Sequence, residues 1–205
     1  MVSVGDGRVA RGDQARKQIM AEAISIGSVE GLESLSIGRL ATALRVSKSG
    51  VFAHFGSKEE LQLAAVRAAA AVFAEQVSAP AMATAPGMAR VRALCEARIS
   101  HAERRVFPGG CFFFSVGAEF DSRPGRVRDA IAAVWREWLR LHAETIEEAR
   151  QLGEISSDIE TKQLVFELDA FITAANLQST LQDDAGAWER ARVGIRERLA
   201  AASQK

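Results

Sequence analysis

The sequence is poor in the features that usually mark sheets and cross-linked folds. It has no tyrosine, only four prolines and only two cysteines among its 205 residues. Cys95 and Cys111 are too few for a disulfide framework, which favours a reducing compartment. Strand signals are nearly absent, and the abundance of Ala, Leu, Glu and Arg favours helices. We therefore predict an all-α fold.

Long apolar runs are missing as well. The most apolar run, AAVRAAAAVF at residues 64–73, is interrupted by Arg67. It is too short to span a bilayer, which requires about 20 apolar residues. The N-terminal stretch has no apolar core of the kind found in secretory signal peptides. We expect a cytoplasmic protein without a membrane partner.

Signatures of catalysis and of metal binding are also lacking. The chain contains no GxSxG motif, no Walker A motif and no paired-carboxylate signature. His101 and His142 are 41 residues apart, which does not match the close spacing of typical zinc ligands. We therefore expect no enzyme activity, no cofactor and no metal.

Charge is balanced overall but not along the chain. There are 26 basic and 26 acidic side chains, yet residues 1–58 hold eight basic and five acidic ones. The segment from Ser36 to Lys58 contains four basic residues and no acid. A local field of one sign attracts an anionic partner even when the net charge is zero. Four like charges on a solvated face can also arise by chance, so charge alone leaves both interpretations open.

Helical spacing and capping residues predict about nine helices. A flexible arm is expected over residues 1–12, and the first helix from near Asp13 to a stop at Gly31. Capping boxes are predicted at Ser57 with Glu60 and at Ser157 with Glu160. The remaining helices are expected after Ser36, after Ser47, from 58 to a break at Pro80, and over 88–105, 111–120, 125–151, the residues after 160, and those after 186. For CFFFSVGAEF at 111–120 a strand is the alternative.

Two of these helices lie close together in the basic segment. Each has about seven residues, and a tight turn near Arg45 and Val46 separates them. This layout is typical of a helix-turn-helix, whose second helix enters a DNA major groove. Small residues on that helix, such as Ser49, Gly50 and Ala53, would allow close approach to the groove. The alternative is a plain helical hairpin whose polar residues only face water.

The segment GLESLSIGRLATALRVSKSGVFAHFGSKEEL resembles the N-terminal DNA-binding domain of TetR/AcrR-family regulators, over about Ile19 to Leu63. The resemblance implies a homodimer with three N-terminal helices for DNA (13–57) and a larger domain for dimerisation and an inducer (58–205). Phe52 stands where the family usually has a tyrosine that bonds a phosphate, and Arg45 replaces a common glycine. The predicted DNA-contacting residues are Ser36, Arg39, Arg45, Ser47, Lys48, Ser49, Gly50, Phe52, His54 and Lys58.

The C-terminal region carries most of the large aromatic residues, with polar groups between them. Core packing explains most of them, but pockets for small molecules are also apolar chambers with a few placed polar groups. We hypothesise a pocket for an apolar or aromatic ligand. Its predicted lining is Phe113, Trp135, Trp138, His142, Phe166 and Asp169.

The last two predicted helices carry apolar stripes that suggest a dimer surface. In a homodimer they could pair with their symmetry mates in a four-helix interface. The alternative is that they pack only on their own subunit. The predicted interface residues are Leu164, Leu168, Phe171, Ala175, Trp188, Ala191, Ile195 and Leu199.

Together these features predict a dimeric DNA-binding transcriptional regulator. We expect a repressor that a small ligand releases from a near-palindromic operator. The alternative is a helical small-molecule binding protein or an enzyme in which the N-terminal motif has no DNA-binding role.

Overall fold

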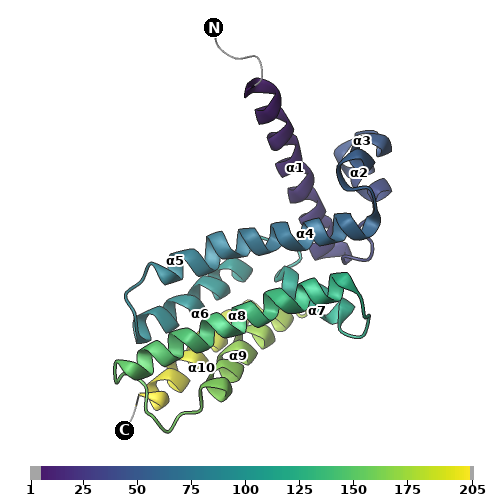
Figure 1. Cartoon of the computed structure of the whole chain (residues 1–205). Helices are drawn as coiled ribbons and strands as arrows, with labels where there is room; N and C mark the ends of the chain where they lie inside the picture. Colours follow the sequence, from purple (N-terminus) through teal and green to yellow (C-terminus); the bar gives the residue numbers. More distant parts are fainter. Residues whose placement is uncertain (1–5, 204–205) are drawn as a thin grey trace.

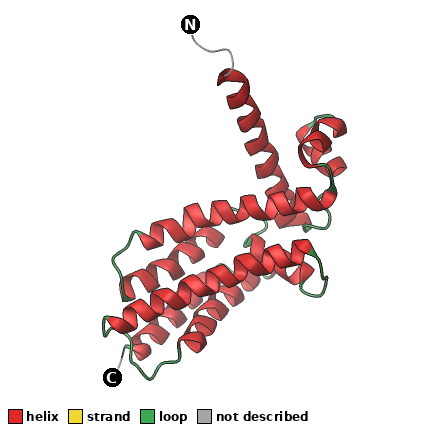
Figure 2. Ribbon diagram, in the orientation of Figure 1, coloured by secondary structure: helices red, strands yellow, loops and turns green. Residues whose placement is uncertain are grey.

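The computed structural model describes residues 6–203, with side chains from residue 16 onward. Helices joined by short loops make up the described backbone, which has no strand (Figure 2). The elements are α1 (Asp6–Glu30), α2 (Ile37–Leu44), α3 (Lys48–Phe55), α4 (Lys58–Phe73), a π-helical turn (Ala74–Ser78), α5 (Ala79–Met82), α6 (Met88–Glu103), α7 (Phe112–Phe120), α8 (Arg126–Gln151), α9 (Thr161–Leu181) and α10 (Ala187–Ala202).

The helices form two parts of unequal size (Figure 1). α1 rises from the side of α4, and the short helices α2 and α3 lie beside it. The longer helices α4, α6, α8, α9 and α10 run alongside one another below, with α7 at one end. α9 and α10 pack closely against each other. The arrangement confirms the predicted all-α fold with an N-terminal three-helix unit.

Two predicted helix boundaries near the N-terminus and Pro80 are wrong. α1 begins at Asp6, so residues 6–12 are helical and only residues 1–5 of the expected arm lie outside the described part. Pro80 does not end the helix that starts at Lys58. The π-helical turn widens the backbone before it, and the Ala79 N–H donates to the Ala74 carbonyl. Pro80 therefore falls in the first turn of α5, where a missing N–H costs little.

Counted as one rod, α4, the π-helical turn and α5 bring the described helices to nine, as predicted. The segment 111–120 is the helix α7, so the strand alternative is excluded. The predicted capping box of Ser157 with Glu160 is wrong. Glu160 is itself the N-cap of α9, and its carboxylate accepts from the N–H groups of Lys162 and Gln163.

One hydrophobic core connects the N-terminal unit to the rest of the molecule. It contains Leu32 and Leu40 from the N-terminal unit together with Phe112 and Phe120 of α7 and Ile131 of α8. A second core lies among α6, α8, α9 and α10. α7 is therefore packed against the N-terminal unit by its buried face.

Candidate nucleic-acid interface and ligand pocket

The turn between α2 and α3 is held by backbone and side-chain caps. Arg45 ends α2 in the left-handed conformation (φ 57°, ψ 39°), as expected for a residue replacing glycine. The hydroxyl of Ser36 accepts from the Arg39 N–H at 3.1 Å, and that of Ser47 accepts from the Gly50 N–H at 3.2 Å. Val51 of α3 is buried. These contacts fix the direction of α3 and determine which of its faces is exposed.

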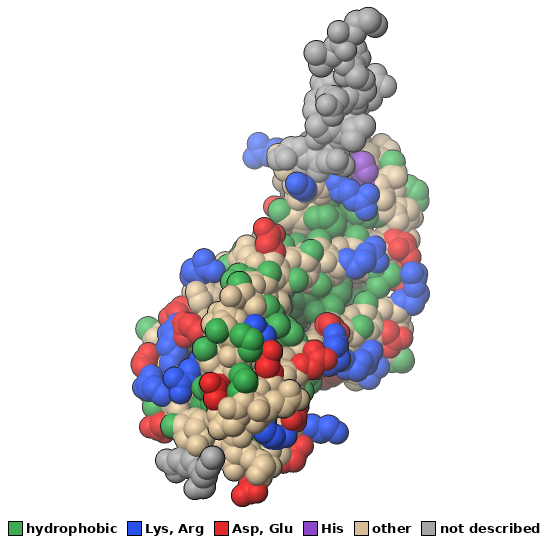
Figure 3. Space-filling model, turned by 60° about the vertical axis from the view of Figure 1, so that its left-hand side comes forward, with side chains coloured by type: hydrophobic (Ala, Val, Ile, Leu, Met, Phe, Trp, Pro, Cys, Tyr) green, Lys and Arg blue, Asp and Glu red, His purple; other side chains and the backbone are tan. Residues whose placement is uncertain are grey.

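Most of the predicted DNA-contacting residues are exposed on α3 or next to it. The exposed members of that set are Arg45, Ser47, Lys48, Ser49, Gly50, Phe52, His54 and Lys58. Ser36 and Arg39 are partly exposed. Figure 3 shows basic side chains over the upper part of the described surface, whereas acidic and basic ones alternate below. The structure thus brings these residues to one side of the N-terminal unit.

Two of the predicted basic contacts have acidic partners within the chain. The guanidinium of Arg39 forms an ion pair with Glu30, and the Lys58 Nζ lies 2.6 Å from the Glu33 Oε1. These hydrogen bonds lower the pKa of the Glu30 and Glu33 carboxyls. Both pairs are exposed, and exposed ion pairs contribute little to stability. A phosphate can therefore compete for both cations at little cost.

A shallow apolar depression lies on the same side, between α2 and α3. Its volume is about 480 Å³, and it is lined by Ile37, Gly38, Lys48, Ser49, Phe52 and Ala53. The stem of Lys48 crosses over Gly38, where an added Cβ would lie 3.4 Å from the Lys48 Cε. Sequence reasoning did not name Gly38 or Ile37, because they meet Lys48 and Phe52 from another helix.

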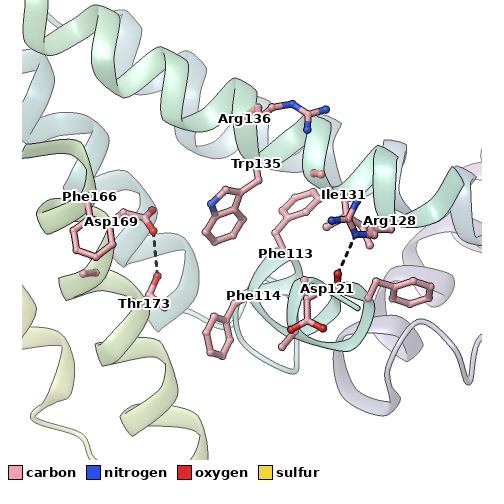
Figure 4. Close-up of a pocket in the computed structure, with 15 residues that line it drawn as sticks. Phe113, Phe114, Asp121, Arg128, Ile131, Trp135, Arg136, Phe166, Asp169 and Thr173 are labelled. Carbon is pink, nitrogen blue, oxygen red and sulfur yellow. Dashed lines mark hydrogen bonds between the residues drawn. The ribbon is translucent and has the colours of Figure 1, made fainter. Parts of the chain in front are cut away.

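A larger pocket of about 630 Å³ opens between α7, α8 and α9 (Figure 4). Four of the predicted ligand-binding residues line it: Phe113, Trp135, Phe166 and Asp169. In Figure 4 the aromatic side chains from α7 and α8 face Asp169 and Phe166 across the pocket. Phe114, Ile131 and Thr173, which sequence reasoning did not name for the pocket, complete much of the wall.

Trp138 and His142 lie behind the pocket and are not part of its lining. The Trp138 Nε1 donates to the Asp169 Oδ1 at 3.3 Å, and its ring packs on His142 with centroids 4.3 Å apart. His142 is buried, and neither ring nitrogen has a hydrogen-bond partner among the described residues. Burial, with a smaller effect of Arg98, lowers the pKa of His142 to about 4. Both residues therefore support the pocket wall from inside.

An ion pair is buried at the edge of the pocket. The guanidinium of Arg98 on α6 donates to the carboxylate of Asp169 on α9. It also lies 5.6 Å and 5.5 Å from the ring centroids of Trp135 and Trp138. The side chains are only 5% and 14% exposed. The charge of Asp169 is therefore already paired with that of Arg98, and the pocket offers its ligand mainly apolar surface.

α7 contacts the N-terminal unit on the side away from the pocket. The Glu119 carboxylate accepts from the main-chain N–H groups of Leu32 and Glu33 at 2.7 and 2.8 Å. Leu32 also accepts from the Gln62 side chain at 2.8 Å through its carbonyl. The turn between α1 and α2 is thus held by α7 and α4 together. Sequence reasoning missed Glu119 because 86 residues separate it from Glu33.

Helix α8 makes a further link to α4. Arg126 Nη1 lies 2.9 Å from the Glu59 carboxylate and 2.7 Å from that of Glu60. The Ser57 hydroxyl accepts from the Glu60 N–H at 3.1 Å, as one half of the predicted capping box requires. Glu60 therefore combines a helix-capping position with an ion pair between helices.

Seven of the eight predicted dimer residues belong to the core of their own subunit, so this assignment needs correction. The buried residues are Leu164, Leu168, Ala175, Trp188, Ala191, Ile195 and Leu199. They fill the space between α9, α10 and the helices beneath. Phe171 is 36% exposed, and its ring packs over Gly194 of α10. The apolar stripes marked the inward faces of these helices.

The outward side of α9 carries other apolar residues. Phe166 is 67% exposed, Leu177 is 44% exposed and Leu181 is 73% exposed. Their spacing of 11 and four residues places them on one helical face.

None of the described helices is both long and apolar enough to cross a membrane.

Comparisons with known proteins agree with this geometry. A family model described as "Bacterial regulatory proteins, tetR family" matches residues 19–65. A second model, "Tetracyclin repressor-like, C-terminal domain", matches residues 87–195. The chain is 28% identical over 131 residues to the transcriptional regulator AcuR of Cereibacter sphaeroides. That match covers 63% of this chain and only 59% of the relative.

Solved structures share the fold over nearly the whole chain. A TetR transcriptional regulator from Chloroflexus aurantiacus is 24% identical, with a TM-score of 0.80, covering 96% of this chain and 98% of that one. AibR, solved in complex with isovaleryl coenzyme A and operator DNA, is 20% identical, with a TM-score of 0.70, covering 91% and 97%. The two family models together span both parts of the molecule, and the chain belongs to the tetR family of bacterial regulatory proteins.

Proposed function

We propose that this protein is a dimeric transcriptional repressor that a small apolar or aromatic ligand releases from a near-palindromic operator. Each subunit would place α3 in a major groove, with half-sites about one helical turn apart. One observation carries the proposal. The helix that forms a wall of the pocket, α7, also holds the turn between α1 and α2 through Glu119.

The coupling follows from the two faces of α7. Phe114 and Gly117 line the pocket, whereas Phe112 and Val116 belong to the core shared with the N-terminal unit and do not line the pocket. Phe113 and Phe120 take part in both. A ligand that displaces the pocket face moves Glu119 and the turn it holds. The ligand shifts the population only by as much as it binds the released state better than the DNA-bound state. α7 thus connects the pocket to the unit that carries α3.

The pocket favours a ligand with a large apolar body. Its aromatic walls dominate, and the carboxylate of Asp169 is engaged by Arg98. A volume of about 630 Å³ is within the usual range of drug-sized ligand pockets. AibR, a protein of similar fold, was solved with both isovaleryl coenzyme A and operator DNA. Acyl and aromatic compounds are therefore the first ligands to test.

The exposed side of α9 is the proposed dimer surface. Leu177 and Leu181 present apolar area there, beside Phe166, which also lines the pocket. Phe171 continues this area toward α10. A symmetric pair of such faces buries this area, which is the main driving force for association.

A mobility-shift titration with the DNA upstream of the gene tests the proposal. We expect binding that weakens steeply with salt, since phosphate neutralisation releases counterions. Lys48→Ala should weaken binding and reduce the salt slope by about one per half-site. Arg140→Ala, which removes an exposed cation from α8, serves as the matched control. Undiminished binding by Lys48→Ala would refute the assignment of this surface.

The ligand half of the proposal has its own measurement. Acyl and aromatic compounds are screened by thermal shift, and those that stabilise the protein are added to the DNA complex. Stabilising compounds should release DNA from the wild type. Compounds that stabilise the protein and leave the complex intact would contradict ligand release while leaving DNA binding in place.

A further inference from the structure

The apolar depression on the DNA-facing side has no role in phosphate binding. Phe52 contributes its ring and is 55% exposed, although it is a large apolar residue. Ile37 and Ala53 extend the apolar wall on either side. A large aromatic ring costs free energy when it is left in water, so its exposure on a binding face points to a contact made there.

The chemistry of the Phe52 ring limits what that contact can be. The ring has no hydrogen-bonding atom, so it cannot bond a phosphate as a tyrosine hydroxyl would. In the major groove of B-DNA the apolar group on a base edge is the C5 methyl of thymine. The depression adjoins Lys48, one helical turn before Phe52, and residues 36–58 include no acid to repel DNA.

We propose that Phe52 determines part of the operator sequence by receiving a thymine methyl group in the depression it forms with Ile37 and Ala53. Lys48 contacts the neighbouring base edge or phosphate from the opposite rim. The stem of Lys48 lies over Gly38 of α2 and forms this rim. The inference rests on the proposed DNA-binding function and adds the chemical group that α3 reads.

The test begins by selecting sites from random duplex DNA with the full-length protein. A synthetic duplex of the selected site is then prepared with each thymine in turn replaced by deoxyuridine, which lacks only the methyl group. We expect one thymine per half-site at which the replacement weakens binding about fourfold, the equivalent of one buried methyl group. Replacement in both half-sites should weaken binding about fifteenfold, as the product of two such losses.

Variants of the protein test whether Phe52 causes the loss of binding seen with deoxyuridine. In Phe52→Ala the deoxyuridine penalty should vanish, and the thymine should no longer be selected at that position. Phe52→Leu should retain most of the penalty, because leucine still offers apolar surface. His54→Ala, an exposed α3 position that lies two residues from Phe52 and outside the depression, is the matched control and should keep the full penalty. Circular dichroism confirms that each variant folds, as expected for exposed positions.

The outcomes separate this inference from the proposed function. Failure to select any sequence would refute sequence-specific DNA binding itself. A selected site in which no deoxyuridine weakens binding would overturn the role of Phe52 alone. The same holds if Phe52→Ala weakens all sequences equally and keeps the penalty, since the ring would then contact the sugar-phosphate backbone.

Discussion

The Glu119 carboxylate lies 2.7 Å from the Leu32 main-chain nitrogen and joins the pocket helix to the turn before α2. Replacing Glu119 with Gln removes the charge and leaves one oxygen for two N–H groups. We expect a loss of about 1–2 kcal/mol in the free energy of unfolding. Ligand affinity should be kept, and the ligand should release DNA less completely.

Urea unfolding and DNA titrations with and without a stabilising compound measure both effects. Glu144→Gln, at an exposed glutamate of α8, is the control. If Glu119→Gln showed unaltered stability and a full ligand response, the link through α7 would be rejected.

Arg45 is predicted to lower stability through its left-handed backbone. Arg45→Gly should raise the free energy of unfolding by about 1 kcal/mol, because glycine adopts this conformation without a steric cost. For a chain of this size the melting temperature should rise by about 2–4 °C. DNA affinity should fall, since a cation is lost. Arg45→Ala, which loses the charge and keeps the strained backbone, separates charge from strain, and a melting temperature that Arg45→Gly does not raise above that of Arg45→Ala would contradict the interpretation.

Removing one partner of the buried ion pair of Arg98 with Asp169 is predicted to lower the free energy of unfolding far more than replacing both residues with apolar ones. Asp169→Ala leaves an uncompensated buried guanidinium and should cost about 3–5 kcal/mol. The double variant Arg98→Met, Asp169→Leu should recover most of that loss. A double-mutant cycle by urea unfolding measures the coupling. Additive losses would mean that the two side chains do not depend on each other.

Two buried histidines predict weaker folding in mild acid. Burial lowers the pKa of His101 and of His142 to about 4, below the ordinary value of 6.5. The unfolded chain therefore binds more protons between pH 6.5 and 4, and stability falls as the pH decreases through this window. The slope is at most about 1.4 kcal/mol per pH unit for each histidine. Carboxyls with lowered pKa, such as Glu30, contribute only below about pH 4.5.

Urea unfolding at pH 7.5, 6.5, 5.5 and 4.5 checks this prediction. His142→Leu should show a shallower decline than the wild type. An equally steep decline in His142→Leu would mean that other groups cause it.

Charged substitutions on α9 test the proposed dimer surface. Leu177→Arg combined with Leu181→Arg places two cations on the exposed face of α9 and should give a monomer by light scattering after size exclusion. Leu152→Arg, at an exposed leucine at the end of α8, should leave the oligomeric state unaltered. A wild type that is already monomeric at micromolar concentration would refute the surface outright.

The helices and the local turns were largely predictable from the sequence, because their signals are local. Ser36 and Ser47 cap as predicted, and Arg45 takes the conformation of the glycine it replaces. Failures arose where the signal is not local. The stripe containing Leu164 and Leu168 has the same spacing whether it faces its own core or a partner.

Only part of the pocket lining was predicted, because its signal is not local either. Periodicity places Trp135 and Trp138 on α8, but it does not decide which one faces the cavity and which one supports it from behind. Glu119 binds the turn between α1 and α2, and no spacing along the chain reveals such a partner.

The core that runs from Leu32 through Phe112 to Ile131 has a thermodynamic consequence. A fragment cut after residue 57 would lose its apolar contacts with α4 and α7, so the N-terminal unit should not melt as a separate transition. A calorimetric scan should therefore show α3 and the pocket helices unfolding together. A compound that binds in the pocket and raises the melting temperature of the protein then also makes local unfolding of α3 rarer.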